Sequence, residues 1–153
     1  MVYVCDEKPF LSVAARTKDR DVFPTVDLSI SDPAHRTQGE RRSGAKIPES
    51  RYGRVVQIPK MPQHSKALAI EICNAEQGPY ELTVEEHGNG AYVLAVSGSD
   101  DTRDTNELVL YHIAKEGRIL HYEFTFRADP KQIVVNWLDP TGQEQSKIES
   151  SEW

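Results

Sequence analysis

The chemistry that the sequence suggests most directly is the binding of a cation by an acidic stretch near residue 100. Residues 97–107 read Ser-Gly-Ser-Asp-Asp-Thr-Arg-Asp-Thr-Asn-Glu. Carboxylate, amide and hydroxyl oxygens are the ligands that a hard cation such as Ca²⁺ takes. The stretch lacks the Asp-x-Asx-x-Asx-Gly spacing of an EF-hand, so an ordinary solvated loop stays the alternative to a calcium site. The candidate ligands are Asp100, Asp101, Asp104, Asn106 and Glu107.

Two histidines offer an alternative metal site. His112 and His121 flank Glu116-Gly117, and a two-residue hairpin loop there would place them directly opposite each other. Glu123 would lie on the same face, and two imidazoles with a carboxylate suit Zn²⁺. A three-residue loop would instead pair His112 with Leu120 and separate the ligands. Because closed zinc sites normally have four ligands, an exposed cross-strand pair is the alternative interpretation. Beyond these two metals the sequence indicates no cofactor.

Positive charge gathers in one segment of an otherwise acidic chain. Residues 33–66 hold eight of the 18 Lys and Arg against two Glu, a net charge of +6, which leaves −12 for the rest of a chain whose total is −6. The segment is a candidate interaction surface, and a solvated loop is the alternative. Nucleic acid is not the expected partner, because Tyr52 is the only aromatic residue among these charges. The candidate surface residues are Arg36, Arg41, Arg42, Lys46, Arg51, Tyr52 and Arg54.

Catalytic motifs are missing from the sequence, so we expect no enzymatic activity. The chain contains no Gly-x-Ser-x-Gly elbow, no His-Glu-x-x-His and no glycine-rich phosphate loop. Glu85 and Glu86 are adjacent carboxylates, but neighbouring residues of a strand point to opposite faces and cannot flank one bond.

Runs with apolar residues at every second position predict an all-β protein. Strong turn signals such as Asp32-Pro33, Gly78-Pro79 and Asp129-Pro130 separate these runs. No stretch carries the three-to-four-residue periodicity of an amphipathic helix. Strands are predicted near 2–5, 10–15, 25–31, 54–58, 67–73, 79–86, 91–97, 107–114, 119–127, 132–138 and 143–148.

Two of these runs predict a specific hairpin. Residues 80–84 and 92–96 read Tyr-Glu-Leu-Thr-Val and Tyr-Val-Leu-Ala-Val, with Gly88-Asn89-Gly90 between them. A three-residue loop closed by Gly90 in the left-handed conformation would place Val84 opposite Leu94. All the apolar residues of both strands would then share one face.

Alternation also predicts which side chains are buried and how the strands are layered. One face of each strand is polar, so two sheets must pack through their apolar faces. We therefore predict a single domain over residues 1–153, an antiparallel β-sandwich of immunoglobulin-like or jelly-roll type. A long irregular connection is expected at 32–66, which contains four of the nine prolines. The predicted inward residues include Val26, Leu28, Ile30, Leu68, Ile70, Ile72, Tyr122, Phe124, Phe126, Ile133, Val135 and Trp137.

Compartment and redox state are constrained only in part by the sequence. Cys5 and Cys73 are the two cysteines, and they form either one bridge or two buried thiols. No apolar run approaches the roughly 20 residues that span a bilayer, so no membrane span is expected. The N-terminus, MVYVCDEKPF, does not read as a signal peptide, which leaves a cytosolic protein or one whose leader has been removed.

Residues 25–97 resemble a module found in bacterial secreted and cell-surface proteins, including domains attached to extracellular peptidases. The resemblance rests on the order of several short phrases, each weak alone. These are Asp32-Pro33 with Arg36 and Gly39, then Ile47-Pro48-Glu49-Ser50-Arg51-Tyr52, the strand Lys66-Ala67-Leu68-Ala69-Ile70, and Gly78-Pro79-Tyr80 leading into the repeated Tyr-x-Leu-x-Val runs. The chain departs from the pattern at Pro79, which lacks a ladder donor and predicts an edge or a bulge there.

The resemblance implies an extracellular home and a non-catalytic accessory, spacer or adhesion module, with a protein or glycan as ligand. It therefore favours a removed leader over a cytosolic protein. Two alternatives stay open. One is a calcium-assisted carbohydrate-binding domain, which requires an exposed aromatic or polar cleft on one sheet. The other is a small inhibitor or immunity-type protein that binds an enzyme through the basic 33–66 segment. We expect a monomer.

Overall fold

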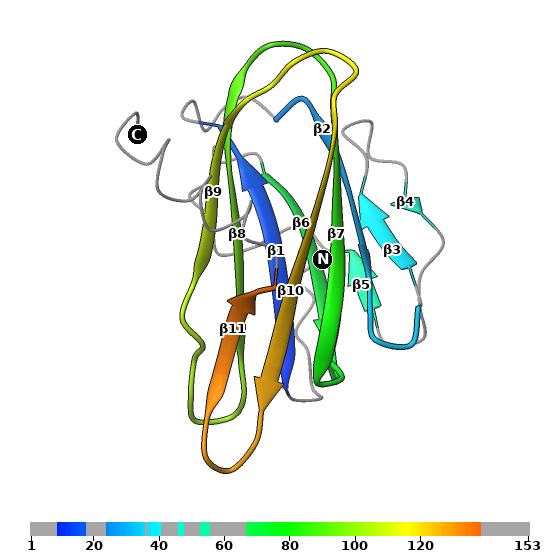
Figure 1. The fold of residues 1–153 in the computed structure, drawn as a ribbon. Coiled ribbons are helices and arrows are strands. Elements are labelled where there is room, and N and C mark those ends of the chain that lie inside the picture. Colours follow the sequence, from blue (N-terminus) through cyan, green and yellow to red (C-terminus); the bar gives the residue numbers. More distant parts are fainter. Residues whose placement is uncertain are drawn as a thin grey trace.

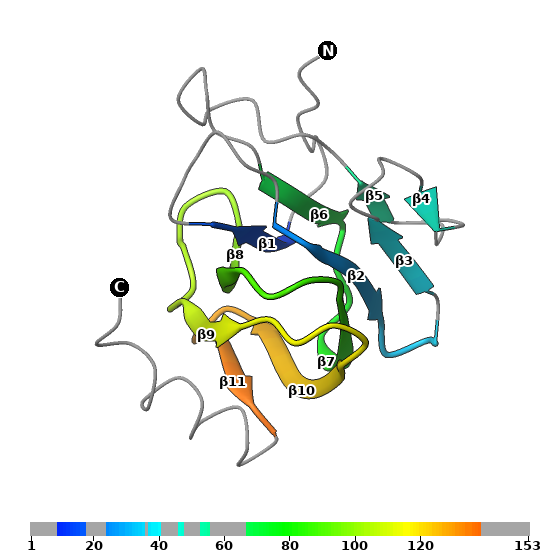
Figure 2. The ribbon, with the colours of Figure 1, turned by 90° about the horizontal axis from the view of Figure 1, so that it is seen from above.

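The computed structural model describes residues 9–17, 24–35, 37–40, 46–47, 53–55 and 67–138. Within these ranges every regular element is a β-strand, and the strands form two antiparallel sheets. Sheet A has the order β5 (Gly53–Val55), β6 (Ala67–Cys73), β1 (Phe10–Arg16), β8 (Ala91–Ser99) and β9 (Leu108–Ile113). Sheet B has the order β11 (Ile133–Trp137), β10 (Ile119–Ala128), β7 (Gly78–Glu86), β2 (Val26–Ser31), β3 (Thr37–Glu40) and β4 (Lys46–Ile47). The two sheets lie face to face, as the views across the strands (Figure 1) and along them (Figure 2) show. This confirms the predicted β-sandwich.

The two-residue period of the sequence sets which side chains enter the core. Buried and partly exposed positions alternate along β1 and β2 and through most of β7. The core combines branched aliphatic residues with a stack of aromatic rings. Tyr80 and Phe124 lie with ring centroids 5.4 Å apart and almost parallel, and Trp137 meets Phe124 edge-on at 6.5 Å. Trp137 is half-buried against this core, as its alternating neighbours predicted.

The predicted hairpin between residues 80–84 and 92–96 is wrong. β7 lies in sheet B between β10 and β2, whereas β8 lies in sheet A between β1 and β9. Val84 and Leu94 are both buried, but they reach the core from opposite sheets. Alternation specifies the buried face of a strand and leaves its hydrogen-bonding partner open.

The connection after β7 crosses from one sheet to the other. The His87 N–H donates to the Thr25 carbonyl, and the Gly90 carbonyl accepts from Ala114 N–H. Gly88, rather than Gly90, takes the left-handed conformation, with φ of 101°. The connection from β9 to β10 crosses at the same end of the sandwich (Figure 1). His112 and His121 therefore lie in different sheets, and the hairpin predicted for them is wrong as well.

Part of the predicted irregular connection forms short strands at the sheet edges. β3 and β4 extend sheet B beyond β2, and β5 extends sheet A beyond β6. Pro79 pairs with Thr125 of β10 on one side. On the other side, the pairing of β7 with β2 begins only at Glu81, which lies opposite Ser31. Pro79 therefore needs no ladder donor on its other side, which fits the predicted edge position. The strands predicted at 2–5 and 143–148 lie outside the described residues.

None of the described residues forms a helix long and apolar enough to cross a membrane.

Close packing at one glycine gives a testable consequence. A Cβ added at Gly98 would lie 2.7 Å from the Phe10 carbonyl oxygen and 2.9 Å from Cε1 of Phe126. Backbone on one side and a core ring on the other leave little room to yield, so Gly98→Ala should reduce the free energy of unfolding by about 1–3 kcal/mol. Gly90→Ala is the matched control, because nothing lies within 4 Å of a Cβ there. Urea denaturation measures both variants, and equal stability would contradict this packing.

Candidate functional site

A buried carboxylate fastens the end of the sandwich at which the two crossing connections meet. Glu86, the last residue of β7, has 0% of its side chain exposed. Oε1 of Glu86 accepts from Nε of Arg118 and from the backbone N–H of Lys115, the latter at 3.1 Å. Oε2 of Glu86 accepts from Nη2 of Arg118 at 3.0 Å and from the Tyr92 hydroxyl at 2.5 Å. The side chain thus ties β7 to β8 and to the β9–β10 turn.

We call the contacts that Glu86 makes with Tyr92, Lys115 and Arg118 the clasp. Backbone hydrogen bonds of Glu86 strengthen it. Glu86 N–H donates to the Arg118 carbonyl at 2.8 Å, and the Glu86 carbonyl accepts from Gly117 N–H at 2.9 Å. Gly117 makes this turn with φ of 84°. Arg118 also donates to the Ile113 carbonyl, so its guanidinium links both ends of the turn.

The surroundings of Glu86 keep it ionised. Burial alone raises the pKa of this carboxyl, but the hydrogen bonds from Arg118, Tyr92 and Lys115 outweigh burial and hold the pKa below its ordinary value of 4.5. The same contacts act on the partners. Burial and the Glu86 charge raise the pKa of Tyr92, and the hydrogen bond to Glu86 raises the pKa of Arg118. Both oxygens of Glu86 are occupied by protein donors, which suits a structural anchor.

His112 continues this polar cluster into the core. The residue is 3% exposed, and its Nε2 lies 2.8 Å from the Tyr122 hydroxyl. The ring lies between those of Tyr92 and Tyr122, at centroid distances of 5.5 and 5.9 Å. Burial lowers the pKa of His112 to about 4, partly offset by the nearby Glu86 charge. His112 is therefore neutral at physiological pH.

The zinc site predicted from His112, His121 and Glu123 is not assembled. His112 points into the core from sheet A, whereas His121 and Glu123 are exposed on the outer face of β10. Nδ1 of His121 lies 3.2 Å from Oγ1 of Thr83. The prediction failed because it assumed that β9 and β10 pair with each other.

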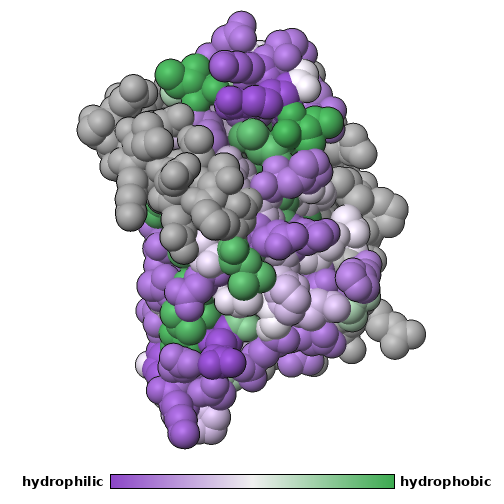
Figure 3. Space-filling view, in the orientation of Figure 1, coloured by the Kyte–Doolittle hydropathy of each residue, from purple (hydrophilic) through white to green (hydrophobic). Residues whose placement is uncertain are grey.

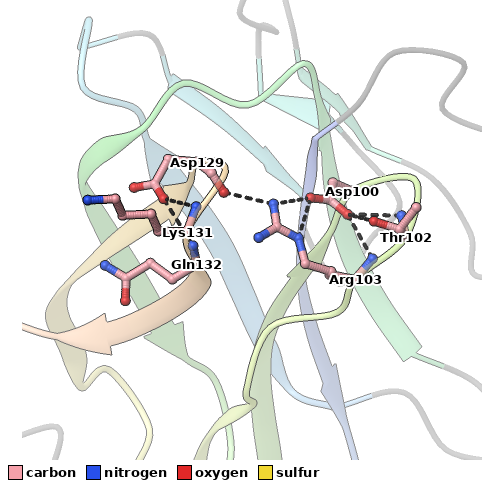
Figure 4. A network of polar contacts seen from close by, with 6 residues as sticks. All are labelled: Asp100, Thr102, Arg103, Asp129, Lys131 and Gln132. Carbon is pink, nitrogen blue, oxygen red and sulfur yellow. Dashed lines mark hydrogen bonds and ion pairs between the residues drawn. The ribbon is translucent and has the colours of Figure 1, made fainter.

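Within the acidic 97–107 stretch, the Arg103 side chain forms an ion pair with Asp100 (Figure 4). Oδ1 of Asp100 accepts from the N–H groups of Thr102 and Arg103, and Oδ2 accepts from Nε and Nη2 of Arg103. These contacts, the Thr102 and Arg103 donors above all, lower the pKa of Asp100 to about 2. Nη2 of Arg103 also donates to the Asp129 carbonyl, which joins this loop to the β10–β11 turn. The Arg103 guanidinium thus supplies the positive charge beside Asp100.

The other four candidate calcium ligands take no part in the Asp100–Arg103 contacts described above. Asp101, Asp104 and Glu107 are exposed, and Asn106 binds the backbone N–H and carbonyl of Val135 through its side-chain amide. Among the described residues, three acidic or histidine ligand atoms come close together at Asp27, Glu85 and His87, away from this loop. The calcium site stays a prediction.

Most of the predicted basic surface lies outside the described residues. Lys46 is in β4 and Arg54 is in β5, on short strands at the edges of the two sheets. Arg36, Arg41, Arg42, Arg51 and Tyr52 are outside the described ranges.

The outer face of sheet B carries an acidic surface that the sequence analysis did not single out. Two pairs of acidic residues lie directly opposite each other there, Glu81 with Glu123 and Asp27 with Glu85. Ser29, Ser31, Thr83 and Thr125 share this face. We call these eight residues the acidic face. Alternation already placed each of them outward, but only the strand order β10–β7–β2 brings the charges together.

His87 stands at one end of the acidic face. Nε2 of His87 is 3.0 Å from Oδ2 of Asp27 and 3.8 Å from Oε1 of Glu85. The three ligand atoms lie within 4.8 Å of one another. One imidazole and two carboxylates in this arrangement can share a proton or hold a divalent cation.

The outer face of sheet A is different in character. A hollow of about 250 Å³ there has one aromatic residue, Tyr111, and two charged ones, Arg16 and Glu107; the rest of its lining is Ser12, Ala14, Val93, Ala95, Ser97 and Val109. The visible surface of the molecule is mainly hydrophilic over the described residues, with a few scattered apolar groups (Figure 3). A row of exposed aromatic rings, as a carbohydrate-binding cleft would use, does not occur in this hollow.

Cys73 at the end of β6 is disulfide-bonded. This excludes a free thiol at Cys73, and Cys5 lies outside the described residues. Comparison with known protein families, curated proteins and solved structures finds no match to this chain.

Proposed function

We propose that this chain is a non-catalytic extracellular accessory module of a bacterial protein, and that it contacts a protein partner through the acidic face of sheet B. The observation that carries the proposal is the pairing of like charges, Glu81 with Glu123 and Asp27 with Glu85. Like charges directly opposite each other on neighbouring strands destabilise a sheet. Two such pairs on one face lower the stability of the free protein. A partner surface of opposite charge would relieve this repulsion on binding.

The charge of the acidic face defines the kind of partner. The ionised carboxylates of this face are negatively charged and only accept hydrogen bonds. The complementary partner surface is therefore one that presents lysine and arginine side chains. An acidic glycan would be repelled by the same groups.

The disulfide of Cys73 supports an extracellular location. Disulfides form and persist in oxidising compartments and are rare in the cytosol. The chain is long enough to build a core without such a bridge, so its presence points to the compartment rather than to a need for stapling.

The ionisable groups of the interior support a role without catalysis. Shifted pKa values often mark active sites, but structural ion-pair networks shift them too. Glu86, Tyr92 and His112 are buried between the sheets, and each is hydrogen-bonded to another side chain of the clasp or the core. Asp100 and Asp129 cap turns through backbone N–H groups. These contacts are those of a scaffold.

Binding to envelopes isolated from the source bacterium tests the proposal. We expect the labelled chain to be retained at low salt and released at high salt. The double variant Glu81→Gln with Glu123→Gln should lose retention several-fold while gaining about 0.2–1 kcal/mol in the free energy of unfolding. The double variant Glu107→Gln with Glu116→Gln removes the same charge from exposed positions elsewhere and should bind like the wild type.

Two results would overturn the proposal. One is equal retention of the two double variants, which would leave the acidic face without a role in binding. The other is recovery of the chain from the cytosolic fraction of the source cells with Cys73 open to thiol labelling, which would exclude an oxidising compartment.

A further inference from the structure

We propose that Asp27, Glu85 and His87 form a binding site for one zinc ion on the outer surface of sheet B. This inference goes beyond the proposed function: Asp27 and Glu85 belong to the acidic face, and a metal bound there would leave the Glu81–Glu123 pair as the charge that a partner meets. The three residues come from β2, the end of β7 and the residue that follows Glu86.

The spacing of the ligand atoms fits coordination by a small divalent cation. Nε2 of His87 lies 3.0 Å from Oδ2 of Asp27 and 3.8 Å from Oε1 of Glu85, and all three atoms are within 4.8 Å of one another. Ligand atoms on tetrahedral zinc, with bonds of about 2.0–2.1 Å, stand about 3.3 Å apart. Small side-chain rotations therefore suffice to place the three atoms around one ion.

The charges at this position favour a cation. Asp27 and Glu85 are direct cross-strand partners, and their like charges repel each other. A divalent ion would supply two positive charges and neutralise both carboxylates. Partial burial strengthens this effect, because 13% of the Asp27 side chain and 21% of the His87 side chain are exposed.

The backbone holds the histidine in place. His87 N–H donates to the Thr25 carbonyl at 2.7 Å, which continues the β2–β7 ladder by one more residue pair. A Cβ at Gly88, the next residue, would lie 3.3 Å from the Thr25 hydroxyl, and Gly88 has φ of 101°. The chain therefore leaves the ladder directly after His87, with the imidazole on the same face as Glu85.

The ligand set indicates zinc among the divalent ions. An imidazole nitrogen disfavours Ca²⁺ and Mg²⁺, which take oxygen ligands. One histidine and two carboxylates suit Zn²⁺, with the fourth position open to water or to a ligand atom of a partner. Exposure of 45% for the Glu85 side chain keeps that position accessible.

Calorimetric titration of the untagged, EDTA-stripped chain with zinc chloride tests the proposal. We expect one equivalent to bind, and zinc at about 100 times Kd to raise the Tm by about 5–10 °C. His87→Gln should weaken binding at least tenfold. His121→Gln is the matched control, since His121 is exposed on the same face of the same sheet but outside the group. It should bind zinc like the wild type.

Glu85→Gln gives an independent readout if His87→Gln disturbs the turn, because Glu85 is the most exposed of the three side chains. It too should weaken binding, with the Tm of the metal-free protein little changed. The proposal is overturned if the wild type shows no saturable binding. It is equally overturned if His87→Gln and Glu85→Gln bind like the wild type, or if His121→Gln loses as much affinity as they do.

Discussion

Replacing Glu86 with glutamine should lower the free energy of unfolding by about 1–3 kcal/mol, the usual cost of leaving buried donors without their acceptor, because the Arg118 side chain is 31% exposed and its charge stays partly solvated. Glutamine keeps the size of the side chain but removes the charge that Arg118 and Tyr92 contact. It also replaces one acceptor oxygen with an amide donor, which would face the donors that now converge on Glu86. Urea denaturation at neutral pH measures the change.

The matched control is Glu116→Gln, an exposed carboxylate in the turn that Glu86 fastens. Its stability should stay within about 0.5 kcal/mol of the wild type, as is usual for exposed positions. Similar losses of unfolding free energy for the two variants would contradict a specific contribution of the Glu86 contacts to stability.

The cost of Glu86→Gln should depend on pH in a defined direction. The pKa of Glu86 is lowered on folding, so its contribution is complete above the unfolded value of about 4.5 and is lost as pH falls through the lower folded value. The difference in stability between the wild type and Glu86→Gln should therefore shrink in strong acid. A difference that stays constant down to the acid transition would contradict an ionised Glu86.

Acid should also destabilise the fold through His112, by about 3 kcal/mol between pH 7 and pH 4. Burial lowers the pKa of His112 from 6.5 to about 4. Between these values the unfolded chain binds a proton that the folded chain does not. Stability is thus complete above pH 6.5 and declines as pH falls toward 4.

Comparison of the wild type with His112→Phe isolates this contribution. Phenylalanine fills the space among the rings of Tyr92 and Tyr122 but cannot titrate. We expect its free energy of unfolding to change less with pH than that of the wild type, by about 3 kcal/mol over this interval. The control His121→Gln, at an exposed position, should retain the wild-type slope. A wild-type slope in His112→Phe would show that another group titrates.

The sequence predicts the strands and their buried faces, because both depend on the local period of two. Glu85 and Glu86 illustrate this: they were assigned to opposite faces, and Glu85 lies partly exposed on the outer face of sheet B while Glu86 is buried. Strand partners depend on contacts between distant segments, which local alternation does not encode. The run of two similar strands around Gly88-Asn89-Gly90 therefore indicated a hairpin where the chain crosses between sheets.

Long-range strand pairing also decides which candidate site residues come together. Asp27 and His87 are sixty residues apart in sequence and meet only because β2 pairs with β7. His112 and His121 are close in sequence and separate into different layers. Arg103 was part of the predicted calcium stretch, yet its ion pair with Asp100 follows from the fold of the loop rather than from any motif.

Carboxyl footprinting of the wild-type chain, free and bound to envelopes, tests whether the acidic face is the surface that contacts the partner. A carbodiimide with an amine labels exposed carboxylates, and mass spectrometry reads the labelling at each residue. We expect Glu81 and Glu123 to become protected on binding, while the exposed Glu107 and Glu116 keep their labelling. Unchanged labelling of Glu81 and Glu123 in the bound chain would contradict this role of the acidic face.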